Sequence, residues 1–239
     1  ETDHTDIVYM SKDQEVLRDV EHEVKEEATQ GIVCTNRNKM SLQGLLEYAN
    51  TIDLAEIKDV IQRQIEMNSR ISQEGLDNAW GAQIGKTILG NWGHDVRTEA
   101  CAAAAAGSDA RMSGCPLPVV INSGSGNQGI TVTMPALVYA REWKISEEKM
   151  YRALLVSNLV SIYIKHYIGA LFAFCGAVSA ACGSGAAITF MASGDYQHIG
   201  RTITNTLANV GGIVCDGAKS SCAAKIAASV NAALLAHYM

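Results

Sequence analysis

Four of the seven cysteines lie between residues 173 and 222, surrounded by glycine, alanine and serine. Cys175 and Cys182 are seven residues apart, and Cys215 and Cys222 have the same spacing. Seven residues span two helical turns, roughly 10 Å, whereas a disulfide needs Cα atoms within about 7 Å, so neither pair can be bridged inside a continuous helix. Zinc sites usually carry CxxC or Cys/His pairs at shorter spacing. Two interpretations stay open: buried core cysteines, or thiolate ligands of an iron–sulfur cluster.

A glycine-rich segment over residues 122–129 leads directly into a helical pattern over residues 130–141. The first N–H groups of a helix lack internal partners and carry partial positive charge, which makes such a loop a ready site for a carboxylate or phosphate. Neither a Gly-Lys-Ser/Thr ending nor GxGxxG is present, which argues against a nucleotide loop. A flexible turn whose glycines only supply positive φ explains the local pattern equally well.

Lys165 and His166 close a helix predicted over residues 150–166. Cations at this end of a helix either neutralise its dipole or face a site. The dipole role is the default interpretation for both.

The elements that must position these residues are helices. Hydrophobic residues make up 48% of the chain and aromatic ones only 6%, and Ala and Gly are abundant, which predicts small side chains in closely packed helices. We therefore predict an all-α fold: a single multi-helix domain with closely packed Ala/Gly-rich helices behind a short non-helical N-terminal lead. The predicted helices cover residues 42–49, 54–76, 98–106, 130–141, 150–166, 175–191, 197–209 and 220–237. The expected N-caps are Ser41, Thr51 or Asp53, and Ser146.

Glycines interrupt the far end of the second of these helices. Glycine inside a helix costs about 1 kcal/mol relative to alanine unless close packing or a bend makes use of it. We therefore expect another backbone to approach there. The glycines concerned are Gly75, Gly81, Gly85 and Gly90.

Residues 1–40 are predicted to be a lead or the remnant of a preceding domain. A strand-like stretch over residues 5–10 has no evident partner strand. Residues 12–30 are dense in charge and carry Val16 and Leu17 at helical spacing with further valines, which predicts an exposed amphipathic helix. The following linker contains Cys34, to which we assign no chemistry.

The net charge of −6, without a basic cluster, lacks the electrostatic footprint of a nucleic-acid binder. The longest apolar stretches, over residues 153–160 and 168–191, are broken by polar residues and glycine, so no membrane span is expected. The odd cysteine count and the lack of a signal peptide favour a soluble protein in the reducing cytoplasm.

Three segments resemble one known family. They are Asn122-Ser123-Gly124-Ser125-Gly126-Asn127-Gln128-Gly129, Cys175-Gly176-Ala177-Val178-Ser179-Ala180-Ala181-Cys182-Gly183 and Cys215-Asp216-Gly217-Ala218-Lys219-Ser220-Ser221-Cys222-Ala223-Ala224-Lys225. On these segments residues 41–239 resemble the bacterial and archaeal L-cysteine desulfidase family, which is related to the catalytic alpha chain of iron–sulfur L-serine dehydratases. The resemblance implies that residues 41–239 form an all-helical catalytic domain with an oxygen-sensitive four-iron four-sulfur cluster.

Carried over by position, the resemblance puts the cluster on Cys175, Cys215 and Cys222 and leaves Cys182 as a core residue. The related dehydratases have a longer insert between the last two ligands, so the short connection over residues 216–221 matches the desulfidase branch better. The implied reaction is α,β-elimination of L-cysteine to hydrogen sulfide, ammonia and pyruvate, without pyridoxal. The side chains expected to hold the substrate carboxylate are Ser123, Ser125, Asn127 and Gln128, with Lys165 and His166 as candidates for a catalytic role.

Members of this family carry an upstream segment with a Leu-Gly-Cys-Thr-Glu-Pro motif, whose cysteine is a candidate base, and nothing in this chain matches it. We therefore expect a C-terminal catalytic-domain fragment, inactive alone, that loses its cluster when handled in air. Its expected partners are a small amino-acid substrate and the missing N-terminal segment, and a homo-oligomer is left open. Two other functions also stay open: an L-serine dehydratase-type deaminase, and a non-enzymatic helical binding domain whose cysteines only pack.

Overall fold

The computed structural model describes residues 9–19, 36–169 and 173–239. The chain divides into two compact units, Glu1–Asn36 and Arg37–Met239, which we describe separately.

The described part of the first unit is a β-hairpin. Its strands, β1 (Tyr9–Lys12) and β2 (Glu15–Asp19), pair antiparallel. Asp13 and Gln14 connect them, both with positive φ, 54° and 94°, as a two-residue hairpin turn requires.

The hairpin corrects two predictions about the lead. Tyr9 and Met10, the described end of the strand-like stretch, pair with β2, and the amphipathic helix predicted over residues 12–30 is wrong across β2. Val16 and Leu17 fit a helical period over too few residues to exclude a strand, and the left-handed turn before them reverses the chain. The rest of that predicted helix, and Cys34, lie outside the described residues.

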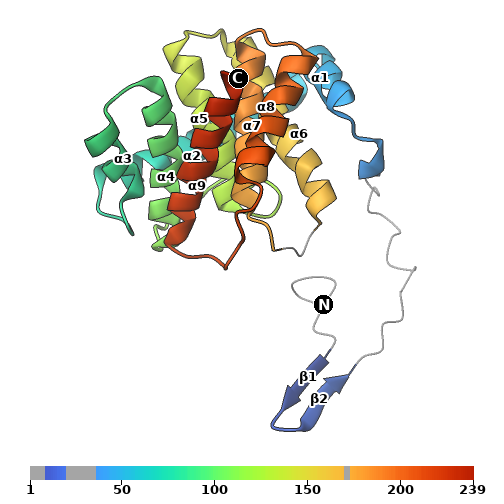
Figure 1. Ribbon diagram of the computed structural model, residues 1–239, viewed down its shortest axis with the longest axis vertical. Helices are drawn as coiled ribbons and strands as arrows, with labels where there is room; N and C mark the ends of the chain where they lie inside the picture. Colours follow the sequence, from blue (N-terminus) through green and yellow to red (C-terminus); the bar gives the residue numbers. More distant parts are fainter. Residues whose placement is uncertain (1–8, 20–35, 170–172) are drawn as a thin grey trace. The chain divides into compact units, whose positions relative to one another are not determined.

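The second unit is all-helical, as predicted (Figure 1). A 3₁₀ turn, η1 (Arg37–Lys39), precedes nine α-helices in the described residues. These are α1 (Leu42–Thr51), α2 (Leu54–Asp77), α3 (Ile84–Trp92), α4 (Val96–Met112), α5 (Gly126–Glu142), α6 (Glu147–Ile168), α7 (Gly176–Met191), α8 (Tyr196–Val210) and α9 (Ser221–His237). Only α3 was not predicted as a separate helix. None of the helices in the described ranges is long and apolar enough to cross a lipid bilayer.

Polar N-caps set where several helices begin. The side chains of Ser41, Asp53 and Ser146 accept hydrogen bonds from N–H groups in the first turns of α1, α2 and α6. These caps were predicted, and Asp53 rather than Thr51 is the one that caps α2.

Helix α7 is the central element of this unit. It packs against α5, α6, α8 and α9, and all its residues except Phe190 are buried (Figure 1). Small residues allow this, because a Cβ on Gly183 would collide with the Ser157 carbonyl of α6, and one on Gly185 would lie 3.1 Å from Ala233 of α9. The predicted close packing of Ala/Gly-rich helices is confirmed at these contacts.

A close backbone approach was predicted at four glycines, and three of them, Gly75, Gly81 and Gly85, lie against α4. A Cβ on Gly81 would lie 3.3 Å from the Asp109 carbonyl. A Cβ on Gly75 would collide with the Ala106 carbonyl, and one on Gly85 would lie 2.7 Å from the Ala102 carbonyl. Gly90, by contrast, faces open space.

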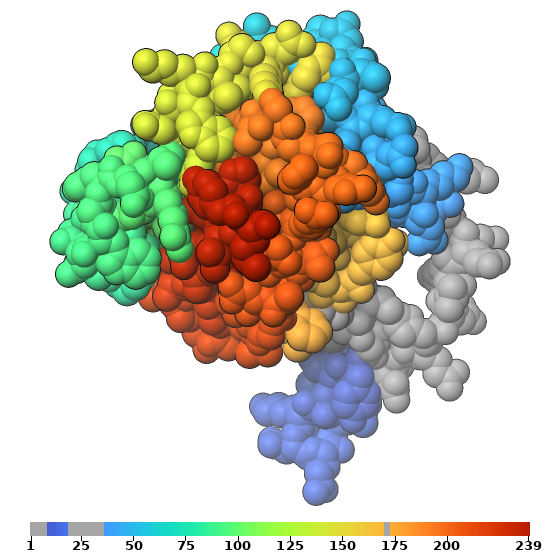
Figure 2. Space-filling view, turned by 45° about the horizontal axis from the view of Figure 1, so that its top comes forward, coloured from blue at the N-terminus to red at the C-terminus, as the bar shows by residue number. Residues whose placement is uncertain are grey.

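Helix α9 completes the unit by packing on α4, α7 and α8. Figure 2 shows its C-terminal end, in red, reaching the surface between the green region of α3 and α4 and the orange residues of α8. The N-terminal end of α9 carries Cys222, and the N-terminal end of α7 follows Cys175. These two helix starts therefore carry two of the three cysteines that the resemblance selects.

Candidate functional site

The segment between α4 and α5 is held on α2 by one buried side chain. The amide of Asn68 brackets Val120: its Oδ1 accepts from the Val120 N–H at 2.9 Å, and its Nδ2 donates to the Val120 carbonyl at 3.2 Å. Gly129 of α5 lies so close that a Cβ there would collide with the same carbonyl. This glycine therefore serves a close backbone approach rather than a flexible turn.

Asn122 fixes the glycine-rich segment to α6. Its side chain is buried, its Nδ2 donates to Asn158 Oδ1 at 3.0 Å, and its Oδ1 accepts from Ser161 Oγ at 3.0 Å. Ser123, a predicted binding residue with a left-handed φ of 49°, also donates its hydroxyl to Asn122 Oδ1, at 2.9 Å. Ser123 thereby supports the shape of the loop. Sequence reasoning did not single out Asn122.

Helix α5 begins at Gly126, four residues before the predicted start. Ser125 is its N-cap: the hydroxyl accepts from the Gln128 N–H at 3.5 Å, and the carbonyl accepts from the Gly129 N–H at 3.0 Å. The N–H groups of Gly126 and Asn127 precede that first intrahelical bond and form the positive end of the helix dipole. A carboxylate bound there would meet two backbone donors.

Arg111, near the end of α4, adds a full positive charge to this helix end. Its Nη1 donates to Asn127 Oδ1 at 3.4 Å, and its Cζ would lie 2.9 Å from a Cβ on Gly126. In the described ranges no carboxylate forms an ion pair with Arg111. Its charge is therefore available to an anion. No sequence pattern pointed to Arg111, because only the packing of α4 on α5 brings it to the loop.

Gln128 links the loop to the start of α7. The side chain is 7% exposed, and its Oε1 has no hydrogen-bond partner among the described residues. Its amide lies against Gly176, the first residue of α7, where a Cβ would stand 2.6 Å from the Gln128 Cδ. Cys175 directly precedes that glycine, so the loop and the first proposed cluster ligand are neighbours.

Cys175 and Cys215 lie on two short antiparallel segments. Phe174 and Val214 form an isolated bridge, flanked by hydrogen bonds of 2.8 Å and 2.6 Å from the N–H groups of the two cysteines. Side chains alternate sides along paired segments, so both thiols leave the bridge on the face opposite Phe174 and Val214. Diagonal neighbours of this kind are about 7–8 Å apart, beyond the reach of a disulfide.

Cys222 lies in the first turn of α9, beyond the short connection that follows Val214. Its thiol donates to the Gly217 carbonyl at 3.7 Å. Lys225, further along the same helix, donates to the Val214 carbonyl at 3.0 Å and forms an ion pair with Asp216. A lysine of α9 thus holds the connection between the last two cysteines against the helix.

The charges of Cys215 and Cys222 both affect the pKa of Cys175. Burial raises the pKa of Cys175, negative charge on Cys215 or Cys222 raises it further, and Lys225 opposes the rise. Among the described residues, however, no three His, Cys, Asp or Glu side chains converge closely enough to hold a single metal ion. Iron–sulfur clusters are held by cysteine thiolates, so the chemical type of these three side chains suits such a cluster.

Cys182 and Cys101 lie in the core. Cys182 is fully buried in α7, and its thiol lies 3.9 Å from the Ile203 carbonyl of α8. Burial raises the pKa of both thiols to about 12, so neither supplies a thiolate near neutral pH.

The two residues at the end of α6 differ in their surroundings. Burial lowers the pKa of Lys165, and charge on the thiols of Cys215 and Cys175 acts in the opposite direction, so Lys165 lies within electrostatic reach of these two cysteines. His166 instead contacts Asn38, with 2.9 Å between Nε2 and Oδ1. The structure therefore brings Lys165, but not His166, toward the thiols.

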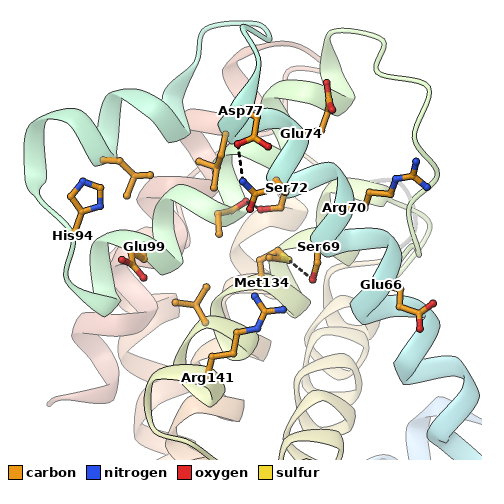
Figure 3. A pocket seen from close by; sticks show the side chains of 15 residues that line it. Glu66, Ser69, Arg70, Ser72, Glu74, Asp77, His94, Glu99, Met134 and Arg141 are labelled. Atoms are coloured by element: carbon orange, nitrogen blue, oxygen red, sulfur yellow. Dashed lines mark hydrogen bonds between the residues drawn. The ribbon is translucent and has the colours of Figure 1, made fainter.

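A cleft of ≈740 Å³ opens elsewhere in this unit, at α2, α3, α4 and α5 (Figure 3). Arg141 points into it from α5, and Glu99 and Asp77 face it from α4 and α2 (Figure 3). None of the predicted site residues lines this cleft. The chemistry-bearing side chains and the cleft are therefore separate features.

Comparison with known proteins gives a family match over most of the chain. The model of the family described as serine dehydratase alpha chain matches residues 11–239. A UPF0597 protein of Lachnoclostridium phytofermentans is 50% identical over 233 residues, 98% of this chain and 55% of the relative. The UPF0597 protein DSY1109 of Desulfitobacterium hafniense is 46% identical over 239 residues, 99% of this chain and 54% of the relative. The chain thus spans about half the length of the curated relatives it matches. No solved structure matches.

Proposed function

The chain belongs to the serine dehydratase alpha chain family, and from this premise we propose that it is the catalytic part of an iron–sulfur lyase that eliminates hydrogen sulfide from L-cysteine. One observation carries the proposal: Cys175 and Cys222 stand at the starts of α7 and α9, and Cys215 directly follows the bridge that pairs Val214 with Phe174, the residue before Cys175. The start of α5, with the N–H groups of Gly126 and Asn127, is joined to this group through the contact of Gln128 with Gly176.

In this proposal Cys175, Cys215 and Cys222 hold a four-iron four-sulfur cluster. When bound, the cluster supplies an iron with an open position that acts as a Lewis acid. Lys165 and Lys225 lie near the thiols and offset the negative charge of the thiolates. Burial alone disfavours a free thiolate at Cys175, which is consistent with a ligand role that neutralises its charge.

The start of α5 binds the substrate carboxylate. The N–H groups of Gly126 and Asn127 donate to its oxygens, and the Arg111 guanidinium, already bonded to Asn127 at 3.4 Å, adds a charge of opposite sign. Ser125 and Ser123 keep this end of the helix in place through the N-cap and the Asn122 bond. These fixed donors orient the amino acid before any bond breaks.

In the reaction a base takes the α-proton of L-cysteine and the C–S bond breaks, so that the β-thiol leaves as hydrosulfide. The hydrosulfide takes up one proton and is released as hydrogen sulfide. The aminoacrylate that remains takes up water and yields pyruvate and ammonia. Lys165 is the candidate in this chain for the proton transfer, because it lies within electrostatic reach of Cys175 and Cys215. His166 is less suited, since its ring contacts Asn38.

L-serine is the second candidate substrate, because the matched family is named for serine dehydratase. Its elimination would release water instead of hydrogen sulfide, with the same contacts to the carboxylate. Parallel assays of hydrogen sulfide from L-cysteine and of pyruvate from both amino acids decide between the two.

The test of the cluster uses the complete protein, reconstituted and handled without oxygen. We expect bound iron and sulfide in equal amounts, a visible absorbance band, and loss of both when Cys175, Cys215 and Cys222 are all replaced by alanine. Cys115→Ala is the matched control, because Cys115 is half-buried outside the group and should leave the cluster intact. A wild-type protein without iron, or an unchanged cluster in the triple variant, would favour a non-enzymatic helical domain whose cysteines only pack.

A further inference from the structure

Gln128 carries a buried acceptor that no described residue of the chain uses. Its side chain is 7% exposed, and its Oε1 has no hydrogen-bond partner in the described ranges. Buried polar atoms in native proteins are almost always bonded, so an unbonded acceptor at this position points to a ligand as its partner.

The usual intramolecular partner of this side chain is already taken. Ser125 and Gln128 occupy the N-cap and third positions of α5, an arrangement in which a glutamine normally bonds back to the N-cap N–H. Here the Ser125 N–H donates to the Asn122 carbonyl at 3.0 Å instead, while the Ser125 hydroxyl accepts from the Gln128 N–H at 3.5 Å. Of the two reciprocal bonds of a capping box, the one from the Gln128 N–H to the Ser125 hydroxyl is formed. The other, from the Ser125 N–H to the Gln128 side chain, is replaced by the bond to Asn122, so the Gln128 amide takes no part in the cap.

The released amide lies at the junction of the two parts of the proposed site. A Cβ on Gly176 would collide with the Gln128 Nε2 and would stand 2.6 Å from its Cδ and 3.0 Å from its Oε1. The side chain of Cys175, the N-cap of α7, forms no capping bond, and the first turn of that helix has no acidic residue. The free acceptor therefore stands between the start of α5, where the carboxylate is proposed to bind, and the thiols.

We propose that Gln128 Oε1 accepts a hydrogen bond from the α-ammonium group of the bound amino acid, and so selects α-amino acids over carboxylates that lack this group. The inference rests on the proposed function, because it requires the substrate carboxylate at the start of α5. An ammonium group has donors only, which suits an acceptor without a partner. A site built to bond a substrate N–H strongly rejects an analogue without it, since the acceptor is then left unbonded.

The test compares two ligands that differ only in the ammonium group and cannot undergo elimination, L-alanine and propanoate. Their affinities for the complete, cluster-loaded protein are measured by ligand-detected NMR titration, and their inhibition of L-cysteine turnover is measured in parallel. Gln128→Met, which keeps the size of the side chain and removes the acceptor, should weaken L-alanine binding by about 10- to 100-fold and leave propanoate binding nearly unchanged.

Two further variants distinguish an acceptor role of Gln128 from a donor role and from a general effect of substitution. Gln128→Glu keeps an acceptor and should retain the preference for L-alanine; if the Gln128 NH₂ group instead donated to the carboxylate, this variant would weaken both ligands. Gln62→Met, on the exposed face of α2, is the matched control and should behave as the wild type.

The outcomes distinguish this inference from the proposed function. An L-alanine to propanoate ratio in Gln128→Met equal to that of the wild type, or no binding of L-alanine to the wild type, overturns the role of Gln128. A wild-type protein that prefers L-alanine through Gln128 but releases neither hydrogen sulfide nor pyruvate overturns the lyase assignment alone.

Discussion

Two glycines of α3 offer a matched test of how closely this helix packs on α4. A Cβ added to Gly85 would lie 2.7 Å from the Ala102 carbonyl and 2.6 Å from the Ala106 Cβ, both on α4. On the same helix, a Cβ added to Gly90 would meet nothing within 4 Å. Gly85→Ala and Gly90→Ala are thus one chemical change in two steric environments.

The expected magnitudes follow from these contacts. Carbon atoms pack at about 3.5–4.0 Å, so Gly85→Ala must move α3 away from α4 by roughly 0.8 Å, which weakens the neighbouring dispersion contacts by a quarter to a half. Overpacking of this kind costs about 1–3 kcal/mol. The move also strains the hydrogen bond of 3.1 Å from the Gly85 N–H to Asp109 Oδ2. Gly90→Ala should instead stabilise by up to about 1 kcal/mol, because alanine favours the helix.

The assay is reversible thermal or urea unfolding of both variants beside the wild type. A difference of about 1–4 kcal/mol between the variants corresponds to roughly 2–16 °C in the midpoint for a domain of this size. The urea m-value should stay constant, since neither change alters the surface exposed on unfolding. Equal midpoints for the two variants would refute the close approach of α3 to α4.

Two other changes test the electrostatics of the fold. Burial lowers the pKa of His237 in the folded state, so below the unfolded value of 6.5 the unfolded chain binds the proton first and the free energy of unfolding falls as the pH falls. The free energy of unfolding changes by at most about 1.4 kcal/mol per pH unit, and the change ends at the pKa of His237 in the folded state. In urea unfolding measured at several pH values, His237→Gln should lack this pH dependence. An unchanged pH dependence in the variant would contradict its assignment to His237. Asp95→Ala should lower the free energy of unfolding by about 1 kcal/mol, because this N-cap of α4 accepts a hydrogen bond from the Thr98 N–H at 2.7 Å. Asp95→Asn keeps an acceptor and should retain most of the stability. Equal losses in both variants would argue against the cap.

Short-range chemistry made much of the helical fold predictable. Ser41, Asp53 and Ser146 were recognisable as caps because a side-chain oxygen before an apolar helical period satisfies the first N–H groups of that helix. The abundance of Ala and Gly predicted close packing, which Gly183 shows against the Ser157 carbonyl.

The features that the sequence did not reveal depend on contacts between distant segments. The predicted start of α5 is too late because Gly126 and Gly129 resemble parts of a loop, whereas they lie in the first helical turn against Arg111 and Val120. Arg111 carries no local pattern that links it to this turn. The Gln128 acceptor likewise becomes free only because a backbone carbonyl takes the N–H of Ser125.

The composition of α7 has a consequence for how the molecule transmits motion. Half of its residues are glycine or alanine, which have no side-chain torsions, so the close contacts that these residues make leave few rotamer changes with which to absorb a disturbance. We therefore expect a displacement at the Met191 end to move the helix largely as one body, over roughly 24 Å, up to the residues that follow Cys175. A change of packing at Met191 is then expected to alter the geometry around the Cys175 thiol without direct contact.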